Sequence, residues 1–214
     1  MFTVGQSSVY TTLIFFLALI LSVGFHEFSH VLSAYLQGDQ TGKMLGRLTL
    51  NPIKHLDLLG TIFMMLAAFT GFGIGWGKPA PFNPYNLRFR RWGSALVAIA
   101  GPISNIFLMA LAGYILLFAG SGLPNGNLLG TFLAYLMIIN ASLALFNLLP
   151  ITPLDGSHLL SAWLGPNNPL VVTLHRYGIY ILVIMLVLGG NFLTWYITGG
   201  VHILLKILGL SSLA

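Results

Sequence analysis

Five long apolar stretches dominate this 214-residue sequence and limit the folds that it can adopt. Each approaches or exceeds the ~20 residues with which an α-helix crosses the hydrocarbon core of a bilayer. Backbone polar groups must be satisfied internally within lipid, so such stretches predict membrane-spanning helices. The sequence therefore predicts an all-α polytopic membrane protein. The stretches are residues 9–36, 93–119, 128–149, 170–188 and 192–208.

The composition agrees with a membrane protein that forms one domain. Hydrophobic residues make up 57% of the chain and charged residues only 6%, whereas globular proteins average roughly 25% charged residues. Cysteine is absent, which excludes disulfides and thiol catalysis. We expect residues 1–214 to form a single integral-membrane domain, with a core over 9–160, C-terminal helices over 168–209 and no appended soluble module.

A sixth segment, residues 58–75, decides between five and six crossings. It is short, and glycine alternates with larger residues near its end, which disfavours a stable helix. If this segment is re-entrant, all basic residues lie on or near one side, which the positive-inside rule identifies as cytoplasmic. We therefore expect about five to six transmembrane helices, a re-entrant segment near 58–75, an outside N-terminus and a cytoplasmic C-terminus. The nine basic residues are Lys43, Arg47, Lys54, Lys78, Arg88, Arg90, Arg91, Arg176 and Lys206.

The first apolar stretch contains the only glutamate of the chain, Glu27, within the motif His26-Glu27-Phe28-Ser29-His30. Side chains four residues apart share one face of a helix, so His26 and His30 can present two imidazole nitrogens to one zinc ion. Glu27 would then lie beside the remaining coordination positions. The motif predicts the site of a zinc hydrolase, placed within a membrane.

Catalytic zinc usually has three protein ligands, and Asp155 is the strongest candidate for the third. It follows an apolar span, and five crossings place it on the same membrane side as the inner half of the first helix. Six crossings would place it on the opposite side. His158 and His55 are weaker candidates, whereas His175 and His202 are more simply explained as interfacial or interhelical residues.

Two intramembrane asparagines form a second group of candidates. Asn105 and Asn147 could hydrogen-bond a developing oxyanion or an extended substrate backbone. Hydrogen bonding between helices is the alternative explanation for both residues. Gly101 and Pro102 could permit close helix approach or a local kink. The glycines near residues 71–75 could shape an edge where a substrate pairs as a strand, with flexible packing as the alternative explanation.

Several motifs together resemble the site-2 protease family, the intramembrane zinc metalloproteases of regulated intramembrane proteolysis, and specifically its compact prokaryotic members. The matching motifs lie at 26–30, 100–105 and 147–156, with further likeness at 46–55 and 75–84. The resemblance implies that His26, His30 and Asp155 bind one Zn²⁺ per chain and that Glu27 is the general base. It also implies cleavage within or near transmembrane segments, in a prokaryotic cell membrane. The basic loops predict that the site lies nearer the cytoplasmic side of this membrane.

The same resemblance implies substrates such as single-span membrane proteins or remnant signal peptides. Other than these, the bilayer is the expected partner, because a net charge of +5 on inner loops suits an anionic leaflet and needs no nucleic acid. The oligomeric state is open. Two alternatives use the same polar residues: a transporter or ion or proton pathway, and a catalytically silent scaffold. The sequence shows no inverted repeat, which disfavours the transporter.

Overall fold

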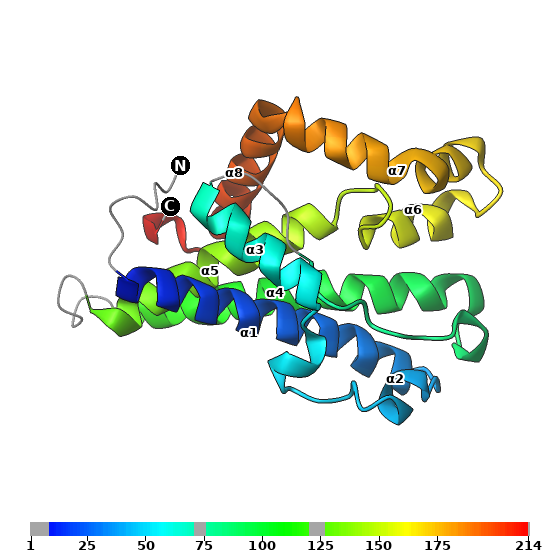
Figure 1. Cartoon of the computed structure of the whole chain (residues 1–214), viewed down its shortest axis with the longest axis horizontal. Coiled ribbons are helices and arrows are strands. Elements are labelled where there is room, and N and C mark those ends of the chain that lie inside the picture. The colour runs from blue at the N-terminus through cyan, green and yellow to red at the C-terminus, as the bar shows by residue number, and fades with distance from the viewer. Residues whose placement is uncertain (1–8, 71–75, 120–126, 214) are drawn as a thin grey trace.

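The computed structural model describes residues 9–70, 76–119 and 127–213, and these ranges form helices joined by loops (Figure 1). An isolated antiparallel bridge pairs Leu56 with Gly77. The α-helices are α1 (Val9–Leu36), α2 (Thr41–Met44), α3 (Leu58–Thr70), α4 (Arg90–Ala119), α5 (Leu128–Asn147), α6 (Gly156–Leu164), α7 (Pro169–Val187) and α8 (Gly190–Ile207). Three short 3-10 helices are η2 (Pro52–His55), η3 (Pro84–Asn86) and η5 (Ser211–Leu213).

The all-α membrane architecture is confirmed, but the number of spans is lower than the five to six expected. Four described helices, α1, α4, α5 and α7, are long and apolar enough to cross a membrane. The expected fifth span corresponds to α8, which is interrupted by polar residues such as Asn191, His202 and Lys206. α3 has 13 residues and is therefore only ~20 Å long, too short to span a ~30 Å hydrocarbon core.

α1, α4 and α5 pack against one another and form the centre of the molecule (Figure 1). α4 runs antiparallel to α1, because Gln37 bonds to Gly93 and His30 approaches Val97. α5 runs parallel to α1, since Ser22 contacts Asn140 near its middle and Phe15 stacks edge-on with Tyr135 further back. The parallel pair brings the chain that follows α5 to the same end as the second half of α1.

The chain just after the proposed re-entrant segment lies beside the chain at its start. The ring of Trp76 stacks on Phe63 of α3 with centroids 5.4 Å apart, and Gly77 pairs with Leu56 just before α3. The Lys78 amide donates to the His55 carbonyl at 2.8 Å. Both ends of the segment therefore lie together, in agreement with the expected re-entrant path. Residues 71–75, including the proposed glycine edge, lie outside the described residues.

The remaining helices cover one flank of this centre. α6 packs beside α4, and α7 and α8 follow as a pair that is visible in orange and red in Figure 1. Leu149 and Leu154, on either side of the turn after α5, pack with Leu182 of α7 and Leu193 of α8. The C-terminal pair therefore supports the loop that carries Asp155.

Candidate metal centre and active site

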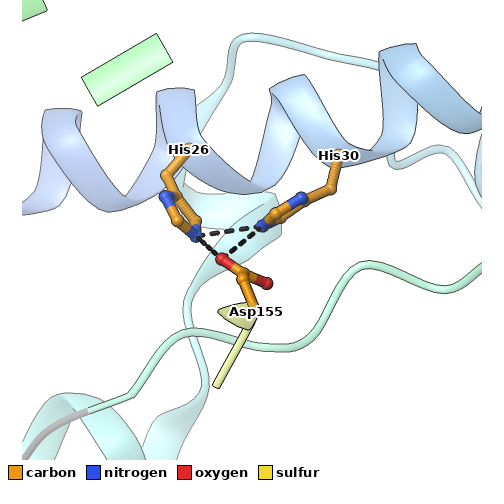
Figure 2. Close-up of side chains that lie close together, drawn as sticks. All are labelled: His26, His30 and Asp155. Atoms are coloured by element: carbon orange, nitrogen blue, oxygen red, sulfur yellow. Dashed lines mark hydrogen bonds and ion pairs between the residues drawn. The ribbon is translucent and has the colours of Figure 1, made fainter. Parts of the chain in front are cut away.

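His26 and His30 project from one face of α1 toward Asp155 (Figure 2). Their Nε2 atoms lie 3.0 Å apart, and their rings meet edge to face with centroids 4.5 Å apart. Both side chains are buried, at 6% exposure each. The helical spacing of four residues thus produces the paired imidazoles that the motif predicts.

Asp155 reaches the two histidines from the turn between α5 and α6. Its Oδ2 atom lies 3.2 Å from His26 Nε2 and 3.4 Å from His30 Nε2, and its side chain is 17% exposed. The Asp155 carbonyl accepts from the His158 amide at 3.0 Å as α6 begins. Two elements far apart in sequence therefore place three ligand-type atoms within 4.8 Å of one another.

The outer nitrogen of each ring lies against a fixed partner. His30 Nδ1 lies 2.7 Å from the Val97 carbonyl, which can only accept, so Nδ1 carries the hydrogen. His26 Nδ1 lies 2.5 Å from Asn105 Oδ1. With a hydrogen on each Nδ1, both Nε2 atoms direct lone pairs toward the Asp155 carboxylate.

This donor set fits a zinc ion. Two lone pairs and a buried carboxylate oxygen at 3.0–3.4 Å repel one another unless a cation lies between them. Ligand atoms ~2.0 Å from a tetrahedral zinc ion are ~3.3 Å apart, which agrees with the three observed separations. Two nitrogens and one oxygen also leave a fourth position for water or substrate, as in catalytic zinc sites.

Gly101 of α4 forms the wall behind the two imidazoles. A Cβ atom at this position would lie 2.5 Å from His26 Cε1 and 2.5 Å from His30 Nε2. Any larger residue would displace the ligand pair. The close helix approach predicted for Gly101 is therefore confirmed, and its purpose is to leave room for the histidine rings.

Glu27 lies on the neighbouring face of α1, beside the loop that follows the re-entrant segment. Its Oε1 is 3.4 Å from the position that a Cβ of Gly77 would occupy, and its buried Oε2 has no hydrogen-bond partner among the described residues. Burial lowers the pKa of the Arg47 guanidinium, while the Glu27 carboxylate acts in the opposite direction. Arg47 therefore supplies positive potential at the Glu27 carboxylate.

The two candidate asparagines lie in different surroundings. Asn105 is completely buried, and it contacts His26 through Oδ1 and Asn140 of α5 through Nδ2. These contacts favour the interhelical role for Asn105 over contact with a substrate. Asn147 is half-buried at the end of α5, where its Nδ2 donates to the Leu143 carbonyl at 3.0 Å.

The other four histidines lie outside the group of three among the described residues. His55 is completely buried, with Nε2 2.8 Å from the Thr49 carbonyl. Burial lowers the pKa of His158, whose ring faces Phe82 at 6.3 Å. His175 contacts hydroxyls of Thr152 and Ser161, and His202 contacts the Thr198 carbonyl of its own helix.

Sequence reasoning missed Asn140, Ser22 and the Val97 carbonyl. Asn140 and Ser22 are both completely buried. Ser22 lies on α1, the helix that carries His26, and Asn140 lies on the neighbouring helix α5. Asn140 carried a usable signal, because an asparagine in the middle of an apolar span is rare and needs a partner. The Val97 carbonyl carried no such signal, since every residue has a main-chain carbonyl.

Comparisons with known proteins define the family. Over 187 residues the chain is 37% identical to the protein named "Putative zinc metalloprotease YwhC" of Bacillus subtilis, which covers 84% of this chain and 83% of the relative. The model of peptidase family M50 matches residues 110–189. The chain belongs to peptidase family M50. It is therefore a member of the site-2 protease family that its motifs resemble.

Two further relatives of this M50 peptidase carry a similar name. "Putative zinc metalloprotease Rip2" of Mycolicibacterium smegmatis is 28% identical over 170 residues, which is 78% of this chain and 64% of the relative. The protein of the same name from Mycobacterium tuberculosis H37Rv is 29% identical over 196 residues, which is 90% of this chain and 73% of the relative. No solved structure matches the M50 chain significantly.

Two different parts of the M50 chain support a zinc metallopeptidase activity, one through the family match and the other through the geometry of the site. The family match includes Asp155 but not the His26–His30 motif, because it begins at residue 110. The structure brings both parts together at one site. The protein is a zinc metallopeptidase carried on apolar, membrane-type helices.

Proposed function

We propose that this protein is an intramembrane zinc metalloprotease that hydrolyses peptide bonds within or near transmembrane segments of other membrane proteins. One observation carries the proposal. His26 and His30 of α1 converge with Asp155, from the turn after α5, beside helices that are long and apolar enough to span a bilayer. Such a set of ionisable groups is costly within a membrane and indicates a functional site.

His26 and His30 would hold one zinc ion through Nε2, and Asp155 would hold it through Oδ2. Zinc bound by these residues supplies a Lewis acid for a peptide carbonyl and lowers the pKa of a water ligand toward ~7. The buried rings and Gly101 shield one side of the three ligands. The partly exposed Asp155 side is where substrate and water would enter.

Glu27 would be the general base. As the water oxygen bonds to the carbonyl carbon, Glu27 takes a proton from the water. Glu27 then delivers this proton to the amide nitrogen as the C–N bond breaks, which releases an amine and a carboxylic acid.

The substrates would be single-span membrane proteins or remnant signal peptides, cleaved nearer the cytoplasmic side of a prokaryotic cell membrane. Asn147 is half-buried near the Asp155 turn, so it remains a candidate for contact with substrate. A substrate helix must unwind before its scissile bond reaches the site, because helical hydrogen bonds otherwise cover the carbonyl.

The first test separates the roles of Glu27 and Asp155. We predict that Glu27→Gln lowers cleavage of single-span membrane proteins in detergent by at least ~100-fold, the lower end of general acid–base contributions, while bound zinc stays near one per chain. Asp155→Ala removes a charged ligand, so we expect it to lower both the cleavage rate and the amount of bound zinc. Cleavage is measured by gel and mass spectrometry, and zinc by elemental analysis.

Glu27→Asp is the matched control, because it keeps the carboxylate but shortens its reach by one methylene. We expect this variant to retain zinc and partial activity. Undiminished cleavage by Glu27→Gln would refute the assignment of the base. A wild-type protein that carries no stoichiometric zinc would refute the metalloprotease itself.

A further inference from the structure

A chain of buried polar side chains connects His26 to the main chain of another helix. Asn105 Oδ1 lies 2.5 Å from His26 Nδ1, and Asn105 Nδ2 donates to Asn140 Oδ1 at 2.7 Å. Asn140 Nδ2 in turn donates to the Leu136 carbonyl and to Ser22 Oγ, both at 2.7 Å. Asn105, Asn140 and Ser22 are completely buried. We call Asn105 and Asn140 the amide relay.

The Leu136 carbonyl fixes the direction of the amide relay. A carbonyl can only accept, so the Asn140 NH₂ group must face Leu136 and its oxygen must face Asn105. The Asn105 NH₂ group then faces Asn140, and its oxygen faces His26. The amide orientations thus follow from the network, although the oxygen and nitrogen atoms of an asparagine are nearly isosteric.

A second carbonyl gives the same direction independently. The single hydroxyl hydrogen of Ser22 is used on the Ala18 carbonyl at 2.7 Å, so Ser22 Oγ is available as an acceptor. It therefore also requires the NH₂ group of Asn140. Because two main-chain carbonyls impose one orientation, the reverse orientation would leave buried donors and acceptors unpaired, at ~1–3 kcal/mol for each group.

We propose that Asn140 is a positioning residue for the metal centre: through Asn105 it holds the hydrogen of His26 on Nδ1 and leaves Nε2 free for the metal. This inference rests on the zinc site of the proposed function. Hydrogen-bond partners behind metal-binding histidines fix the ring orientation and tautomer, and their loss typically costs ~10–100-fold in metal affinity. Asn140 itself touches neither metal ligand Asp155 nor His30 through any described hydrogen bond.

His30 provides an internal reference, because its tautomer is fixed in a different way. Its Nδ1 donates directly to the Val97 carbonyl, which has no alternative orientation. A change at Asn140 should therefore disturb the Nδ1 hydrogen of His26 and leave that of His30 unaffected. General destabilisation of the fold would disturb both.

The test is Asn140→Leu in the full chain, purified in detergent and loaded with excess zinc. Proton NMR of ¹⁵N-histidine-labelled protein observes the Nδ1 hydrogens, which are assigned with His26→Gln and His30→Gln. We expect the low-field His26 signal to move upfield or to be lost, while the His30 signal stays. Zinc affinity, measured by competition with a chelator, should fall ~10–100-fold.

Two controls match the change. Ser104→Ala removes a buried hydroxyl next to Asn105 that, among the described residues, donates to the Gly101 carbonyl of its own helix at 2.7 Å and to no other acceptor. This change should leave zinc affinity within about twofold. Ser22→Ala keeps the Leu136 anchor and should have a smaller effect than Asn140→Leu. If Asn140→Leu fails to fold, Asn140→Ala takes its place with the same expected results.

A rescue distinguishes orientation from packing. In Asn140→Leu, the further change Asn105→Asp supplies two acceptor oxygens, so no relay is needed to orient them toward His26. We expect this double variant to recover the low-field His26 signal and part of the zinc affinity. Equal shifts of both histidine signals, unchanged zinc affinity in Asn140→Leu, or a double variant as weak as the single one would overturn the inference.

Failure of the inference and failure of the proposed function are distinguishable. The NMR and chelator measurements require zinc binding but no cleavage, so they can support Asn140 even if no substrate is cut. Conversely, a wild-type protein that binds zinc and cleaves while Asn140→Leu behaves as wild type would refute only the relay.

Discussion

α4 and α7 are both long apolar helices, yet they serve the molecule differently. Half of the most apolar window of α4 is buried within the protein, against 17% of the corresponding window of α7. α4 brings Gly101 and Asn105 against the histidines, whereas α7 exposes large apolar side chains such as Ile179, Val183 and Val187. Hydropathy identifies both as membrane helices, but only buried polar and small residues show which one builds the site.

Substitutions at three glycines test how closely different helices are coupled to the metal centre. Each lies within a helix, but a Cβ at Gly101 would meet the metal ligands, at Gly178 of α7 the turn that carries Asp155, and at Gly199 of α8 no atom within 4 Å. The effect of adding one methyl group should therefore fall in that order. The gradient measures how strongly each region is coupled to the metal centre.

Gly101→Ala should have the largest effect. The added methyl group would collide with both imidazoles at 2.5 Å, and overpacking of this kind costs ~1–3 kcal/mol before the loss of ligand geometry is included. We expect cleavage to become undetectable and zinc affinity to fall at least ~10-fold, since each 1.4 kcal/mol is a factor of ten. Chelator competition and the cleavage assay measure both. Normal zinc affinity would show that the ligand pair can move away from α4.

Gly178→Ala should have an intermediate effect. Its methyl group would lie 2.5 Å from the Thr152 carbonyl, three residues before Asp155, and would push α7 away from this turn. We expect a zinc affinity reduced by ~3–10-fold, which corresponds to about 1 kcal/mol, together with a lower melting temperature.

Gly199→Ala is the control for both glycine changes. Alanine stabilises a helix interior by up to ~1 kcal/mol relative to glycine, so thermal stability should stay the same or rise while zinc affinity is unchanged. If Gly178→Ala behaved like Gly199→Ala, the C-terminal helices would be independent of the metal centre. The proposed support of the Asp155 turn by α7 would then be wrong.

The smallest expected effect concerns stability at acid pH. It should distinguish the surroundings of Asp39 from the C-terminal helices α7 and α8. Asp39 follows α1, is 1% exposed, and accepts bonds from Thr41, Asn83 and Asn86. Burial raises the pKa of Asp39, but these hydrogen bonds lower it more, so its pKa lies below the usual 3.8. A depressed folded-state pKa stabilises the fold above 3.8, and this stabilisation is lost as the pH falls through the lower folded-state value.

Asp39→Asn should therefore lower the melting temperature at neutral pH by a few degrees and reduce its dependence on pH below 4. Melting is followed in detergent with a chelator present, so that loss of zinc does not contribute. The chain after residue 155 contains no acidic residue, and hydrogen exchange should show acid-induced opening near residues 39–41 and 83–86 before α7 and α8. Simultaneous opening of both regions would contradict this separation.

Much of this arrangement follows from local sequence. The spacing of His26 and His30 places them on one helix face, and apolar stretches locate the main helices to within a few residues. Loop charges favoured a re-entrant segment, and the structure brings its ends together at Leu56 and Gly77. The number of spans was overestimated because length was weighed more heavily than the polar residues of α8.

What sequence alone determined is therefore the local part of the site: an H-E-x-x-H helix in an apolar span, and an aspartate expected on the same membrane side. Tertiary structure decided the rest, including the fit of Gly101 against the rings and the contacts of His26 with Asn105 and of His30 with Val97. These partners lie 79 and 67 residues away in the chain. These contacts depend on how the helices are rotated and shifted along one another. Side-chain packing sets that rotation and register, whereas the hydropathy of the sequence does not encode them.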